Sequence, residues 1–271
     1  MRRNTIPDRP FVGASLLAGG ASVVMQLARP EVGHAVVESR VVAGQLFRRP
    51  LRRTRTTLSF LAVAIAGSDD QRRTLGAEID AVHRRVRSSR TSPLTYDASD
   101  PQLQLWVAAC LYRGIEDTHE AFFGPLTEQQ RESLYAWSAP LATTLQVTPE
   151  QWPPDRNAFE TFWAEGLRHI RIDAVVHTYL DDVVALRFLP RWLAAPLARP
   201  HRFVTAGFLP APFRDAMGFA WSARQQRRFD RWMAVAGAAV RRLPRPVREF
   251  PFDVLLADVR RRIRHGRGVL R

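Results

Sequence analysis

The sequence predicts an all-α protein built as a single helical domain. Apolar residues recur mainly at intervals of three and four, whereas the strict alternation typical of strands is scarce. Of the 271 residues, 46% are hydrophobic and 24% are charged, which fits a folded chain long enough to bury a core. Prolines at positions 190, 196, 200, 210, 212, 244 and 246 should cut the last third into shorter pieces.

Capping and breaking residues define the expected helices. Pro50 should separate two helices, Gly67 should end the second, and Ser68, Asp69 and Asp70 offer capping side chains for the third. We expect helices over residues 32–46, 51–66, 70–87, 103–123, 127–145, 158–169, 173–188 and 219–240. Residues 260–271 form a basic run that we interpret as a solvated, frayed tail.

The apolar stretch over residues 11–28 superficially resembles a signal peptide. Asp8 and Arg9 interrupt its approach, and Gly19, Gly20 and Gln26 weaken it as a membrane span. We therefore expect a buried helix, with a signal or anchor as the alternative. Cys110 is the only cysteine, so an intramolecular disulfide and a cysteine-based zinc site are excluded. This fits a cytoplasmic protein, with peripheral contact to a membrane left open.

The chain carries a net charge of +14, and all 40 basic residues are arginine. Two interpretations stay open: a generic basic surface, or a surface for anionic lipid or nucleic acid. No nucleic-acid-binding motif is present, so we expect no nucleic-acid partner. The phosphate-binding, dinucleotide-binding and serine-hydrolase signatures are also missing, and His119-Glu120 lacks the second histidine of a zincin motif.

His83 shares the apolar stripe of its predicted helix with Ile79, Val82 and Val86. An imidazole that faces inward needs a partner, because an unpaired buried polar group is costly. From the pattern alone, His83 is either a core histidine bonded to a neighbouring group or a ligand of a metal or haem.

A second polar set lies on the preceding helix, where Arg53, Thr56, Thr57, Phe60 and Leu61 share one face. These side chains either line a pocket or bound the core, with the arginine in surface salt bridges. Glu38 is a possible carboxylate partner for Arg53.

Several runs in order along the chain resemble the catalytic-domain family of MpaB and rubber oxygenase. They are Gly19-Gly-Ala-Ser-Val-Val-Met-Gln-Leu-Ala-Arg-Pro30, Val36-Val-Glu-Ser-Arg40, Pro50-Leu-Arg-Arg-Thr-Arg-Thr-Thr-Leu-Ser-Phe60, Val82-His-Arg-Arg-Val86, Tyr96-Asp-Ala-Ser-Asp-Pro101 and Leu105-Trp-Val107. Looser likeness extends through Phe122-Phe-Gly-Pro-Leu126 and Thr148-Pro149 to Leu209-Pro210. The resemblance spans roughly residues 15–220.

The resemblance implies a globin-reminiscent core and, in the latex-clearing branch, a bound haem b. The proximal histidine of that branch falls on His83, and its distal arginine and threonine fall on Arg53 and Thr57. Thr56 stands where that branch has a distal lysine, and an acidic residue of its pocket falls near Glu38. Two further departures are Arg29-Pro30 where many relatives have His-Pro, and Ala108 where they have a histidine.

The function implied is that of a haem b-dependent oxygenase, with O2 and an apolar, isoprenoid or lipid-like molecule as substrates. Oxidative cleavage of a carbon–carbon double bond is the reaction of the resembled branch, and the sequence identifies no electron donor. Two alternatives stay open: a non-catalytic haem-binding or sensing protein, and a cofactor-free helical module that interacts through its basic surface.

Overall fold

The computed structural model describes residues 13–41 and 45–270. Within these ranges every regular element is a helix, and the only strand-like contact is an isolated antiparallel bridge between Arg87 and Asp97. The prediction of an all-α fold is therefore confirmed. One hydrophobic cluster runs through the molecule and includes residues from Ala18 to Val269, as expected for a single domain.

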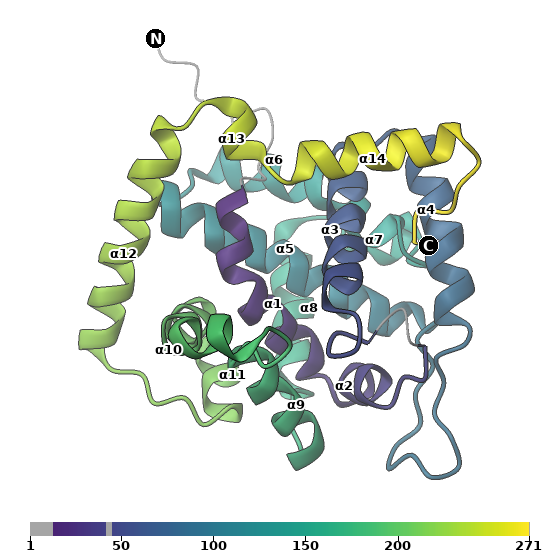
Figure 1. The fold of residues 1–271 in the computed structure, drawn as a ribbon, viewed down its shortest axis with the longest axis horizontal. Helices are drawn as coiled ribbons and strands as arrows, with labels where there is room; N and C mark the ends of the chain where they lie inside the picture. Colours follow the sequence, from purple (N-terminus) through teal and green to yellow (C-terminus); the bar gives the residue numbers. More distant parts are fainter. Residues whose placement is uncertain (1–12, 42–44, 271) are drawn as a thin grey trace.

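Most helices follow one another closely, and a long loop over residues 84–100 joins α4 to α5 (Figure 1). The first half of the chain forms η1 (Gly13–Ala18), α1 (Gly19–Leu27), α2 (Pro30–Val37), α3 (Pro50–Ala66), α4 (Asp69–His83), α5 (Pro101–Phe123), α6 (Glu128–Ser138) and α7 (Pro140–Thr143). The second half forms η3 (Pro149–Gln151), α8 (Arg156–Arg168), α9 (Ala174–Val184), α10 (Arg191–Phe208), α11 (Ala211–Ala216), α12 (Ala223–Arg242), α13 (Arg245–Glu249) and α14 (Phe252–Arg264).

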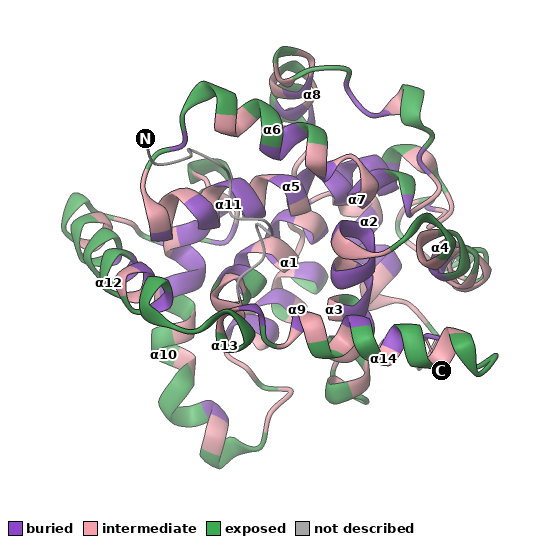
Figure 2. Cartoon of the chain, turned by 90° about the horizontal axis from the view of Figure 1, so that it is seen from above, coloured by how far each residue is buried: buried purple, intermediate pink, exposed green. Residues whose placement is uncertain are grey.

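Helix α5 is the central element, and Figure 2 shows buried residues along most of its length. It packs against α1, α7 and α12. Two glycines permit close approach of its neighbours: a Cβ on Gly166 of α8 would lie 2.4 Å from Trp106, and one on Gly237 of α12 would lie 1.8 Å from the Phe122 carbonyl oxygen. The packing of α5 therefore depends on helices that expose bare backbone to it.

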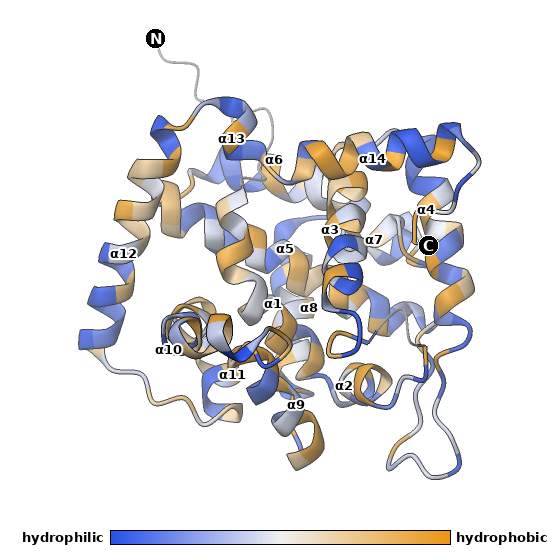
Figure 3. Cartoon of the chain, viewed as in Figure 1, coloured by the Kyte–Doolittle hydropathy of each residue, from blue (hydrophilic) through white to orange (hydrophobic). Residues whose placement is uncertain are grey.

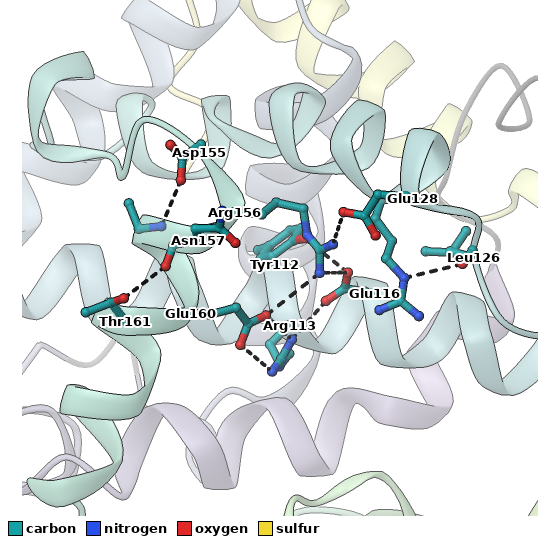
Figure 4. Close-up of polar contacts among 12 residues, drawn as sticks. Tyr112, Arg113, Glu116, Leu126, Glu128, Asp155, Arg156, Asn157, Glu160 and Thr161 are labelled. Atoms are coloured by element: carbon teal, nitrogen blue, oxygen red, sulfur yellow. Dashed lines mark hydrogen bonds and ion pairs between the residues drawn. The ribbon is translucent and has the colours of Figure 1, made fainter.

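A network of ion pairs joins α5 to α8 (Figure 4). Glu116, whose side chain is 2% exposed, accepts hydrogen bonds from Arg113 Nη1 at 3.0 Å and from Arg156 Nη2 at 3.1 Å. Arg113 also binds Glu160 through two parallel bonds of 3.0 and 3.1 Å. Because a buried carboxylate without partners is costly, these arginines stabilise Glu116 in the core.

Local signals account for most helix boundaries. Pro50 begins α3, Gly67 follows its last residue, and Ser68 caps α4 in a capping box with Gln71. Helix α2 ends at Val37 rather than near residue 46, because the Ser39 hydroxyl accepts the Val41 N–H and diverts the backbone from the helix. Residues 42–44 of that predicted helix lie outside the described residues.

Three further expectations differ from the structure. Helix α4 stops at His83, four residues early, and Pro140 splits the predicted 127–145 helix into α6 and α7. Helix α10 continues through Pro196 and Pro200, with its second half buried against neighbouring helices. Packing thus outweighs the backbone hydrogen bonds that the two prolines remove.

Both ends of the described chain are packed. From residue 13 on, the predicted N-terminal helix forms η1 and α1, where Val24 and Met25 are almost fully buried. Residues 11 and 12 lie outside the described part. The expected solvated tail is corrected: α14 includes Arg260–Arg264 and packs on α3, and Val269 is fully buried. Apolar residues of α14 and Val269 bury this segment against the protein, although its many arginines led us to expect a solvated tail.

Candidate functional site

His83 is the last residue of α4, and two glutamines hold one side of its ring. Its Nδ1 lies 3.3 Å from Gln146 Oε1 and 3.3 Å from Gln104 Nε2. Gln104 belongs to α5, and Gln146 follows α7. The Gln146 backbone N–H donates to Gln104 Oε1 at 2.7 Å, so the two glutamines also fix each other. Three separate parts of the chain thus meet at this imidazole.

The surrounding hydrogen bonds determine which nitrogen of His83 carries the proton. Gln104 Nε2 has two hydrogens, and they are donated to Ala98 O at 2.9 Å and to Gln146 Oε1. Gln104 therefore has no hydrogen left for His83, and we assign Nδ1 as the donor to Gln146 Oε1. This assignment leaves the lone pair of His83 on Nε2.

His83 Nε2 is available to a ligand. It forms no hydrogen bond with any residue of the described part of the chain, and it is not among the buried polar atoms. Burial lowers the pKa of His83, the bond to Gln146 opposes this effect, and the nearby charge of Arg53 adds to the lowering. The ring is therefore neutral near pH 7, as an imidazole that ligates a metal must be.

Arg53 lies close enough to this histidine for its positive charge to lower the pKa of His83. Its surface is exposed, and yet burial is the main cause that lowers the pKa of its guanidinium. Among the described residues, the Arg53 side chain has no hydrogen bond or ion pair, so the pair with Glu38 that the sequence left possible is not formed.

The two threonines of this face differ. Thr57, one turn after Arg53, is exposed on the same side of α3. Thr56 is buried, and its hydroxyl donates to Arg53 O at 3.0 Å. Thr57 is therefore exposed beside Arg53 on α3, whereas the Thr56 hydroxyl is bonded to its own helix.

Tyr179 of α9 brings an aromatic side chain to Arg53, and the sequence did not indicate it. Burial raises the pKa of the Tyr179 hydroxyl, and the positive charge of Arg53 opposes the rise. The ring of Phe47 packs against Tyr179 edge to face, with ring centroids 5.2 Å apart. Tyr179 lies 126 residues after Arg53 in the sequence, so no local pattern connects the two and only the tertiary fold brings them together.

Glu38 belongs to a different polar network. Its Oε1 bonds His34 Nδ1 at 2.7 Å, and its Oε2 accepts the hydroxyls of Ser92 at 2.5 Å and Tyr96 at 3.0 Å. His34 Nε2 bonds Asp173 Oδ2 at 2.6 Å. Burial alone would lower the pKa of His34, but its two carboxylate partners outweigh burial and raise it. Glu38 therefore pairs with a histidinium that the sequence did not indicate.

The arrangement around His83 offers a single nitrogen ligand. Residues 13–41 and 45–270 contain no group of three or more histidine, cysteine or acidic side chains able to hold a metal ion. One imidazole can hold a metal whose other ligands come from a macrocycle, which is how a proximal histidine holds haem iron.

Comparison with known proteins identifies the family. The description "ER-bound oxygenase mpaB/B'/Rubber oxygenase, catalytic domain" matches residues 11–238. The chain belongs to this family. It is also 43% identical over 256 residues to uncharacterized proteins of Mycobacterium tuberculosis and Mycobacterium bovis, with 94% of this chain and 100% of each relative covered. No solved structure matches.

The family match covers Glu38, Arg53, Thr56, Thr57 and His83, whereas α13 and α14 lie beyond it. The residues present fit the haem that the sequence resemblance implies, because a neutral imidazole lies close to the Arg53 guanidinium and its Nε2 has no partner in the described part of the chain. Every helix in the described ranges falls short of the length and apolarity that a membrane span requires.

Proposed function

We propose that this member of the oxygenase family binds haem b and oxidises an apolar, isoprenoid or lipid-like substrate. The observation that carries the proposal is the state of His83: its Nδ1 is held by Gln146, and its Nε2 is free and accessible. A second nitrogen anchored in this way is typical of histidines that ligate metals. Oxidative cleavage of a carbon–carbon double bond is the reaction that the family resemblance favours.

Each of the polar residues around His83 has a role in this proposal. His83 Nε2 would hold the iron, while Gln146 would fix the tautomer and orientation of the ring. Arg53 would supply a fixed positive charge on the α3 side, and Thr57 would offer a hydroxyl one turn away. When bound, the haem would supply the oxygen chemistry, and the protein would orient the substrate and exclude water.

Absorption spectroscopy of the purified full chain reconstituted with haem tests the ligand. The wild type should show a Soret band, and His83→Ala should lose it or shift it strongly, because the axial nitrogen is gone. His169→Ala is the matched control, since His169 is an exposed histidine bonded to Glu165 at 3.2 Å. A haem-replete wild type without the band, or with a band unchanged in His83→Ala, would contradict the proposal.

One observation favours a second candidate, a haem-binding protein without turnover. The family resemblance puts a distal lysine at the position of Thr56, and here a short hydroxyl bonds back to its own helix. Oxygen consumption by the haem-loaded protein with an isoprenoid alkene separates the candidates. Consumption that depends on the alkene and falls in Arg53→Gln supports the oxygenase, and a haem-loaded protein that consumes no oxygen supports the binding protein.

A further inference from the structure

Helix α12 presents a basic ridge on its outer side. Its inner face buries Phe229, Met233, Gly237 and Val240. The opposite side carries residues spaced at three, four and seven along the helix, which places them on one line. We define the α12 ridge by these residues, Arg224, Arg228, Arg231, Val235 and Arg242, with Trp232 at its flank.

The arginines of the α12 ridge have no acidic partner among the described residues. Arg224, Arg228 and Arg231 border a hollow of about 550 Å³ together with Trp232. Arg228 lies 4.7 Å above the Trp232 ring, which keeps its guanidinium close to the indole. Asp230, the sole acidic residue of α12, accepts a hydrogen bond from Gln226 at 2.8 Å. The positive charge of the ridge is therefore free to act on an outside partner.

Exposed apolar side chains lie among the arginines of the α12 ridge. Val235 is 71% exposed in the middle of the α12 ridge, and Trp232 is 40% exposed beside it. Figure 1 shows that α12 runs along one edge of the molecule, and Figure 3 shows hydrophilic and hydrophobic stretches along it. At 1.5 Å per residue, this helix offers a straight contact line of about 30 Å.

We propose that the α12 ridge docks on an anionic membrane surface. Arginines would bind lipid phosphates, while Val235 and the Trp232 indole would enter the boundary between headgroups and acyl chains. A nucleic-acid backbone would pair with the arginines equally well. It would leave the Val235 side chain in contact with phosphates and water, so burial of that apolar surface would not contribute to binding. The inference does not depend on haem binding, because every residue of the α12 ridge belongs to α12 and none of them contacts His83.

Co-sedimentation of the full chain with vesicles tests the α12 ridge. Vesicles of phosphatidylglycerol and phosphatidylcholine in a roughly 1:2 ratio should bind the protein, and pure phosphatidylcholine should not. Binding should weaken as NaCl rises from about 0.1 M to about 1 M, because salt screens the arginines. Arg224→Gln combined with Arg231→Gln should weaken binding roughly 25-fold, since each arginine near such a surface contributes about fivefold. Val235→Ser should weaken it as well.

The control removes the same charge elsewhere. Arg85 and Arg90 are exposed and lie in the segment after α4, at the opposite side of the molecule from α12 (Figure 1). Arg85→Gln combined with Arg90→Gln should bind nearly as tightly as the wild type. Absence of binding to the phosphatidylglycerol vesicles would overturn the proposal. So would equal losses in the two double variants, or binding to a DNA duplex that exceeds vesicle binding and is lost in the α12 variant.

Discussion

At the scale of single residues, the decisive feature is the distribution of hydrogens around His83. A neutral imidazole has one donor and one acceptor nitrogen, and a metal can use only the acceptor. Gln146 accepts a hydrogen bond from Nδ1, whereas Gln104 donates both of its amide hydrogens to Ala98 O and Gln146 Oε1. The free nitrogen is therefore Nε2, which is accessible. In the proposed haem site, Gln146, which lies outside α4, would therefore determine that His83 binds the iron through Nε2.

Substitution of Gln146 tests this role. In the haem-loaded protein, Gln146→Ala should lower haem affinity about 10–100-fold, because the imidazole loses the group that orients it. Gln146→Glu keeps an acceptor and adds negative charge, so it should retain haem and lower the reduction potential. Redox titration and haem transfer to an acceptor protein measure the two effects.

Gln129→Ala provides the control, because Gln129 is an exposed glutamine of α6. If Gln146→Ala held haem as tightly as this control, Gln146 would have no positioning role.

Sequence reasoning could find His83 but not its partners. His83 stands on an apolar stripe that repeats within its own helix, so a local pattern marks it as inward-facing. Gln104 and Gln146 lie 21 and 63 residues away, and no period connects them to it. His34 was missed for the same reason, since one of its carboxylate partners, Asp173, is 139 residues distant. Long-range polar contacts follow from packing, which a single sequence does not encode locally.

At the scale of elements, the bonds of His34 tie α2 to α9. His34 is 2% exposed, and its Nε2 is hydrogen-bonded to Asp173. Asp173 also caps α9, because its carboxylate accepts the N–H groups of Val175 and Val176. Glu38 connects the same imidazole to the segment between α4 and α5 through Tyr96. One protonated ring thus fixes three elements relative to one another.

The stability from this link should depend on pH. The pKa of His34 is raised above 6.5, so its contribution is complete below 6.5 and is lost as pH rises through the folded value. The pKa values of Glu38 and Asp173 are lowered from 4.5 and 3.8, so their contributions are complete above those values and are lost at lower pH. His34→Gln should therefore cost most between pH 4.5 and 6.5, by about 2 kcal/mol.

Thermal unfolding across pH measures this difference, with His265→Gln as the control because His265 is an exposed residue after α14. A destabilisation by His34→Gln that stayed constant up to pH values well above 6.5 would show that His34 is not protonated in the fold.

Helix boundaries were predictable where the signal is local. Pro50, Gly67 and Ser68 define α3 and the start of α4 through their own backbone preferences. The spacing of apolar residues could not predict the end of α2, because the Ser39 hydroxyl accepts the backbone N–H of Val41 in place of a helical carbonyl. Prolines 196 and 200 likewise suggested breaks that the packing of α10 overrides.

At the scale of the whole molecule, the C-terminal segment closes over the helices that carry the candidate site. Helix α14 packs on α3 and α4, and Arg55 of α3 binds Asp258 of α14 at 3.3 Å. This segment follows the end of the family match at residue 238. Net charge suggested a solvated tail, but a buried Val269 shows that a few apolar residues decide the position of an arginine-rich segment.

The last residues of the described chain are fixed by one carboxylate, and this contact should influence both helices of the site. Glu78 of α4 accepts the N–H of Val269 at 2.8 Å and that of Leu270 at 2.9 Å. Glu78→Ala should cost about 2 kcal/mol, because two backbone donors lose a charged acceptor. Since the tail bridges α3 and α4, amide hydrogen exchange should rise in both helices and stay unchanged in α8. Glu165→Ala removes an exposed carboxylate on α8 and should cost under about 0.5 kcal/mol in urea unfolding. Exchange in α3 and α4 identical to the wild type would mean that the tail lies on these helices without holding them together.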